Sequence, residues 1–118
     1  MAVIGVFNQS EHWLVIWLEP LGEDYWLRPK EQVRVRNDYE GDEPAFCVGY
    51  WTSESDRAEG IENVNVWVEH GNCDAEVIDS DGNPVDCGYQ RPATISEQWR
   101  VQREQALRAL SKAERSDV

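Results

Sequence analysis

The chain has 118 residues, of which 41% are hydrophobic; this is enough for one domain with a single core and excludes disorder throughout. Its 11 basic and 23 acidic side chains give a net charge of −12, which repels nucleic-acid phosphate and anionic membranes, so we expect neither as a partner. No apolar run approaches the roughly 20 residues that cross a bilayer. The first residues lack the positive segment and cleavage site of a signal peptide, so we expect a cytoplasmic protein.

Short alternating segments joined by turns predict a β-rich body over residues 1–92. The segment 13–19 is apolar on both faces of an extended strand, so it must be covered on both faces and lie centrally. Residues 52–60 are polar and end in glycine, and they predict a loop. We therefore expect an antiparallel β-sandwich of about seven to eight short strands. The strand-like segments are 2–7, 13–19, 25–28, 32–37, 44–51, 63–69, 75–79 and 84–87.

Residues 93–118 predict a C-terminal amphipathic helix in the same domain as the body. Thr94 and Glu97 have the spacing of a capping box, and Trp99, Ala106 and Leu110 follow at helical spacing among good helix formers. Two arrangements stay open at this stage. The helix docks on the acidic body and covers the second face of the central strand, or it projects as an element for oligomerisation or partner binding.

The charge is unevenly distributed along the chain. Residues 1–90 hold 5 basic and 19 acidic side chains, whereas residues 91–118 hold 6 basic and 4 acidic ones. An acidic body favours a basic protein partner, although net charge also serves solubility. Strand alternation directs Trp26 and Trp67 away from the valine-lined face, where either a partner or the C-terminal helix covers them. We predict a protein-binding site that combines these tryptophans with an acidic loop: Asp38, Glu40, Asp42, Glu43, Trp26 and Trp67.

The sequence has no recognisable catalytic or cofactor motif, so we expect a protein that is not an enzyme and that carries no cofactor. Three cysteines, an odd number, favour reduced thiols, and we expect Cys47 to be a buried small hydrophobic residue. A zinc site stays open as an alternative, built from His70 and Cys73 with Cys87 and Cys47.

Two blocks of the chain resemble a group of small bacterial β-proteins. The resemblance covers roughly residues 5–91 and implies a compact bacterial β-sandwich; it carries no activity or site residue to this chain. The first block is Asn8-x-Ser10 followed by Trp17-Leu18-Glu19-Pro20-x-Gly22-x-x-Tyr25-x-Leu27-x-Pro29. The second block is Val66-x-Val68, Asp81-Gly82 and Cys87-Gly88-Tyr89-x-Arg91.

Three functions are compatible with these observations. The first is a non-enzymatic acidic protein that docks a basic partner protein, of the inhibitor or immunity type. The second is a module for a small, carbohydrate-like ligand that stacks on exposed tryptophan rings. The third is a structural zinc-binding domain. The sequence leaves the oligomeric state open.

Overall fold

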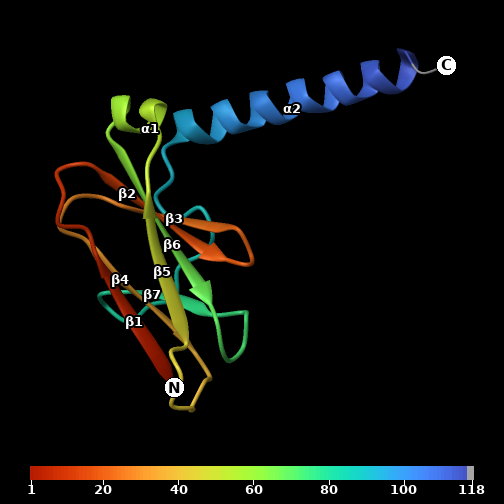
Figure 1. The fold of residues 1–118 in the computed structure, drawn as a ribbon. Helices are drawn as coiled ribbons and strands as arrows, with labels where there is room; N and C mark the ends of the chain where they lie inside the picture. The colour runs from red at the N-terminus through yellow and green to blue at the C-terminus, as the bar shows by residue number, and fades with distance from the viewer. Residues whose placement is uncertain (117–118) are drawn as a thin grey trace.

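The computed structural model describes residues 1–116. Within these residues, seven strands form two sheets, and two helices lie at one end of these sheets (Figure 1). The mainly β fold with one C-terminal helix is confirmed. The strands are β1 (Ala2–Phe7), β2 (Trp13–Glu19), β3 (Glu23–Leu27), β4 (Gln32–Asn37), β5 (Phe46–Trp51), β6 (Ile61–Val68) and β7 (Glu76–Asp79). The helices are α1 (Glu54–Ala58) and α2 (Ala93–Ser116).

The two sheets have the strand orders β1-β4-β7 and β3-β2-β6-β5. All strand pairs are antiparallel except β2 with β6, which run parallel in register from Trp13 opposite Ile61 to Glu19 opposite Trp67. This pair differs from the fully antiparallel sandwich that the sequence predicted. Alternation of side chains predicts the two faces of a strand but not its direction. Between β2 and β6 the chain forms β3, then β4 of the other sheet, then β5 and α1, and it returns to β2 in the same direction.

Strand β2 lies in the middle of the fold and is covered on both faces, as predicted. Leu14, Ile16 and Leu18 point between the two sheets into the main core, which β4, β6 and β7 complete with valines. Val15 points to the opposite face, where it packs with Trp26, Ile61 and Ile95 of α2. The helix therefore supplies the second cover that an apolar strand requires.

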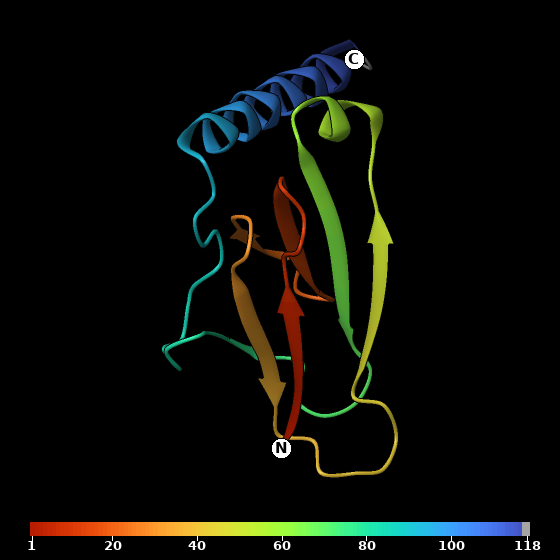
Figure 2. The same ribbon diagram turned by 90° about the vertical axis from the view of Figure 1, so that its left-hand side faces the viewer.

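Helix α2 combines the two arrangements that the sequence left open. Its first turns dock on the sheet through Ile95 and Trp99, whereas every described side chain from Val101 to Glu114 is exposed. Figures 1 and 2 show this second part extending away from the strands. The predicted capping box is wrong: the helix begins at Ala93, before Thr94, and Glu97 pairs with Arg100 instead.

Two local predictions also require correction. Residues 52–60 contain the short helix α1, whose first turn is capped by Ser53: its Oγ accepts the Asp56 amide at 3.1 Å. Cys47 is exposed, because it points to the outer face of the edge strand β5, where no other layer covers it. Cys47, Cys73 and Cys87 are all free thiols, as the sequence predicted.

Candidate functional site

All six tryptophans of the protein gather on one face of the sheet β3-β2-β6-β5, the face turned away from the other sheet. Strand pairing places Val15 opposite Trp26 and Asn63, and Trp51 opposite Asn63, so these side chains share that face. We call it the tryptophan face. Its tryptophans are Trp13 and Trp17 of β2, Trp26 of β3, Trp51 of β5 and Trp67 of β6, with Trp99 added from α2.

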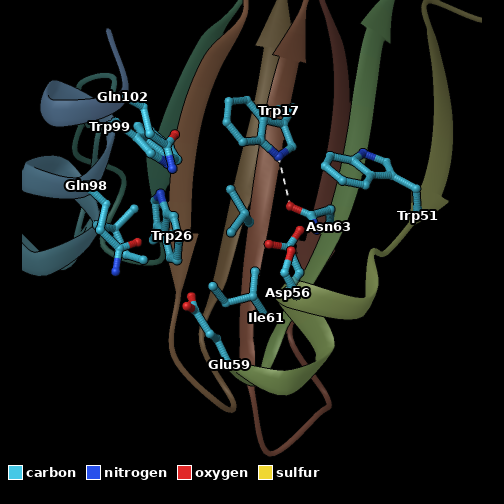
Figure 3. A pocket seen from close by; sticks show the side chains of 13 residues that line it. Trp17, Trp26, Trp51, Asp56, Glu59, Ile61, Asn63, Gln98, Trp99 and Gln102 are labelled. Carbon is cyan, nitrogen blue, oxygen red and sulfur yellow. Dashed lines mark hydrogen bonds between the residues drawn. The ribbon is translucent and has the colours of Figure 1, made fainter. Parts of the chain in front are cut away.

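A groove of about 430 Å³ lies on the tryptophan face between α1 and α2. Its floor is apolar and includes Val15, Trp26 and Ile61. Figure 3 shows Trp17 and Trp51 on either side of Asn63, with the α2 side chains on the opposite flank of the groove. This volume lies within the range of small-molecule and side-chain binding sites.

Two of the rings that line the groove, Trp17 and Trp51, are held by hydrogen bonds from their own indole nitrogens. Trp17 donates from Nε1 to Oδ1 of Asn63 at 3.0 Å, and Asn63 donates from Nδ2 to Oδ2 of Asp56 at 2.9 Å. Trp51 donates from Nε1 to Oδ1 of Asn65 at 2.6 Å. Because these bonds fix the ring planes before a ligand arrives, the groove loses little side-chain entropy on binding.

The polar side chains of the groove are carboxylates, amides and the hydroxyl of Ser55. Asp56 and Glu59 contribute carboxylates from the α1 segment, and Gln98 and Gln102 contribute amides from α2. Among residues 1–114, whose side chains the structure describes, no lysine, arginine or histidine lines the groove. This chemistry suits a cationic or neutral polar ligand and opposes an anionic one.

A buried ion pair fixes the helix that forms one wall of the groove. Arg91 donates from Nε and Nη2 to the two carboxylate oxygens of Asp24, and Trp26 donates from Nε1 to Oδ2 at 2.7 Å. Burial opposes the charged form of Asp24, but the hydrogen bonds from Arg91 and Trp26 outweigh it and hold the pKa of that carboxyl below its usual value. The Arg91 guanidinium also lies 4.7 Å from the centre of the Trp99 ring.

The structure separates the six residues that the sequence assigned to a protein-binding site. Trp26 is only 2% exposed, because Ile95 and Trp99 of α2 cover it, and what remains open of it belongs to the floor of the groove; its contact with a partner stays a prediction. Trp67 is 44% exposed and lies on the tryptophan face, at the end of β6 that is remote from α1. The helix therefore covers one of these two tryptophans and leaves the other open.

The acidic loop lies at the end of the molecule opposite the groove, beside the N-terminus (Figure 2). Three of its acids have partners within the chain. The N-terminal ammonium pairs with Glu40, His70 Nε2 lies 3.5 Å from Glu43 Oε2, and the Asn72 amide donates to Asp38 Oδ1 at 2.8 Å. Asp42 is exposed. Because these contacts occupy part of its charge, the loop offers less to a partner than its sequence suggests.

The zinc alternative has no geometric support in the part of the chain that the structure describes. Within residues 1–116, no three histidine, cysteine, aspartate or glutamate side chains lie close enough together to hold a metal ion. The spacing of His70 and Cys73 is compatible with zinc, but the fold does not bring Cys47 and Cys87 to them. Also within residues 1–116, no helix is long and apolar enough to cross a membrane.

We compared the chain with protein-family models, with curated proteins and with solved structures, and none of the three comparisons found a match. Sequence reasoning placed Trp17 in the central strand but missed its role in the groove, and it missed Trp51, Asn63 and Asp56 as a group. The sequence did show the alternation of side chains in both strands. Once β5 and β6 are known to pair, this alternation places Trp51 and Asn63 on one face.

Proposed function

We propose that this protein is a non-enzymatic acidic binding protein whose groove docks a basic segment of a partner protein, in the manner of an inhibitor or immunity protein. The observation that supports the proposal is the lining of the groove: the indole rings of Trp17 and Trp51, held by hydrogen bonds, lie near the carboxylates of Asp56 and Glu59, and none of the described residues that line it is basic. Indole faces attract cations, and carboxylates pair with them, so an arginine or lysine side chain meets both.

The charge of the whole body supports the same class of partner. Residues 1–90 carry 19 acidic and 5 basic side chains, so a basic protein is attracted before contact and nucleic acid is repelled. This field raises the association rate more than the affinity of the final complex. A cytoplasmic bacterial location belongs to this proposal as well.

The proposal divides the work between two parts of the surface. The groove supplies affinity, because Trp17, Trp51 and Trp99 are amphipathic rings of the type that dominates binding energy at interfaces. The loop with Asp38, Glu40, Asp42 and Glu43 contributes to the long-range field at the far end of the molecule. Trp67 lies between these two regions on the tryptophan face.

The test uses synthetic peptides in which arginine and lysine alternate with apolar residues, compared with peptides of the same composition that carry glutamate instead. We expect the basic peptides to bind and the acidic ones not to. Trp51→Ala and the double variant Asp56→Asn/Glu59→Gln should each weaken binding about tenfold or more, since each removes a central anchor. The matched control is Glu54→Gln, which removes one charge from the same helix outside the groove.

Rates of peptide association and dissociation distinguish the contribution of the groove from that of the acidic loop. Neutralising Asp38, Glu40, Asp42 and Glu43 together should slow association and flatten its dependence on salt, while dissociation stays the same. Basic peptides that bind equally well to the wild type, to Trp51→Ala and to the double variant would show that the groove is not the docking site, and the proposal would then be wrong.

A carbohydrate-like ligand is the second candidate, and a separate observation favours it. The amides of Asn63, Gln98 and Gln102 lie beside tryptophan faces, and rings with adjacent amides are suited to stack on a sugar and hydrogen-bond its hydroxyl groups. A panel of neutral oligosaccharides, followed by tryptophan fluorescence, distinguishes the two. Sugar binding should be lost in Trp51→Ala but should not respond to salt, whereas binding of a basic segment responds to both.

A further inference from the structure

Helix α2 is longer than its contact with the body requires. Only Ile95 and Trp99 near its start pack into the apolar cluster on the sheet. Residues 102–116 extend beyond this contact, over a length of about 22 Å at the usual rise per residue. We call residues 102–116 the α2 arm. A single helix of this length is marginally stable in water, because helices in proteins gain most of their stability from packing an apolar face.

The arm carries such an apolar face, and its own body does not cover it. Ala106 and Leu110 continue the row that begins with Ile95 and Trp99. Ala106 follows Trp99 by seven residues, and Leu110 follows Ala106 by four. Leu107 borders this row and is 61% exposed, and Leu110 is 62% exposed. The face that packs on the sheet near the helix start therefore continues, exposed to solvent, as far as Leu110.

A surface of matching character exists on the same molecule, on the half of the tryptophan face that α2 leaves open. On β5, Cys47 and Gly49 are exposed, and Gly49 has no atom within 4 Å of the place where a Cβ would stand. Trp51, 41% exposed, and Trp67, 44% exposed, lie on the same face, Trp51 two residues after Gly49 on β5 and Trp67 opposite Cys47 on β6. We call the surface formed by Cys47, Gly49, Trp51 and Trp67 the β5–β6 trough.

The arm cannot reach the trough of its own chain, because the helix is one continuous element that extends away from the sheets (Figure 1). A second copy can supply it. The charges agree with this pairing: the arm contains four basic and two acidic residues, while residues 1–90 carry 19 acidic and 5 basic ones. By strand alternation, Glu19 also lies on the tryptophan face, directly opposite Trp67.

We infer that the chain forms a reciprocal homodimer in which the α2 arm of each copy packs into the β5–β6 trough of the other. The contact is isologous, because each copy gives one arm and one trough. It repeats on a second molecule the contact that Ile95 and Trp99 already make on the first: an apolar helix row on the tryptophan face. The trough shares Trp51 with the groove and the arm shares Gln102 with it, so the variants that test the dimer change neither of these two residues.

Sedimentation velocity of the full chain over a range of concentrations tests the inference. The wild type should pass from monomer to dimer, and added salt should weaken the dimer. Leu107→Gln/Leu110→Gln changes the arm and Trp67→Thr changes the trough; each variant alone should be monomeric at concentrations where the wild type is dimeric. Circular dichroism establishes that each variant is folded. A mixture of the two variants retains one intact arm and one intact trough, so it should form a weak heterodimer.

Cross-linking gives the second readout. In a Cys73→Ser/Cys87→Ser background, Leu110→Cys should form a disulfide with Cys47 of a second copy, while Lys112→Cys, about 160° around the helix from Leu110, should not. A wild type that stays monomeric at every concentration overturns the inference. A dimer that Trp67→Thr leaves unchanged overturns it as well, because that result means that the arms pair with each other.

Discussion

Arg91 forms a two-bond ion pair with the buried carboxylate of Asp24, from Nε to Oδ2 at 2.8 Å and from Nη2 to Oδ1 at 2.5 Å. Asp24 belongs to β3, and the ring of Trp99, under which the guanidinium lies, belongs to α2. One side chain thus joins the sheet to the helix and sets the wall of the groove. The same Asp24 carboxylate also accepts from Trp26, whose ring forms the floor.

Replacing Arg91 by alanine should destabilise the protein by about 3–5 kcal/mol, because the substitution leaves a buried carboxylate without its cation. Urea unfolding followed by tryptophan fluorescence measures the effect. The matched control is Arg100→Ala, which removes an exposed arginine from the ion pairs with Glu97 and Glu104 and should leave the unfolding midpoint nearly unchanged. Equal midpoints for the two variants would contradict a structural role for the Asp24–Arg91 pair.

The stability should fall in acid through the protonation of Asp24. The pKa of its carboxyl is lower in the folded protein than in the unfolded chain, where it is about 3.9. Between these two values the unfolded state binds more protons, so the stability that Asp24 contributes is complete above the unfolded pKa and is lost as the pH falls through the folded pKa. Unfolding free energies measured from neutral pH into acid should show this loss, and Asp24→Asn should show a smaller one.

The docked and the projecting parts of α2 should respond differently to mutation. Ile95→Ala should cost about 2–5 kcal/mol, since Ile95 is buried against Val15 and Trp26. Val101→Ala, six residues further along the helix and exposed, should change the stability by less than about 0.5 kcal/mol. In Ile95→Ala the quencher acrylamide should reach more of the tryptophan fluorescence. If the two variants behave alike, the first turns of α2 do not cover the sheet.

Cys87 should be the slowest of the three thiols to react with iodoacetamide. Burial raises the pKa of the Cys87 thiol, and the nearby Asp24 carboxylate, which accepts from Sγ at 3.5 Å, disfavours the thiolate further, although a backbone hydrogen bond partly offsets this. Three variants that each keep one cysteine allow the rates to be compared at mildly alkaline pH. A rate for Cys87 equal to that for Cys47 would contradict the contact with Asp24.

The sequence alone determined the parts of this protein that depend on local pattern. Residues 13–19 are apolar on both faces, and that pattern requires a covered, central strand whatever the strand order is. Helix formers after residue 92 indicated α2, although the predicted capping box does not form, because the helix begins before Thr94 and Glu97 pairs with Arg100. The resemblance to bacterial β-proteins and the function remain predictions.

The tertiary structure alone decided which tryptophans a ligand can reach. Alternation put Trp26 and Trp67 on the same kind of face, yet α2 covers Trp26 and leaves Trp67 open. The groove could not be predicted from alternation at all, because its residues Trp17, Trp51 and Asp56 lie on three different elements. The parallel pairing of β2 with β6 and the antiparallel pairing of β6 with β5 bring these elements together. Sequence pattern reports which side of a strand is apolar; which element covers that side depends on contacts between residues far apart in the chain, and a single sequence does not encode these as a local signal.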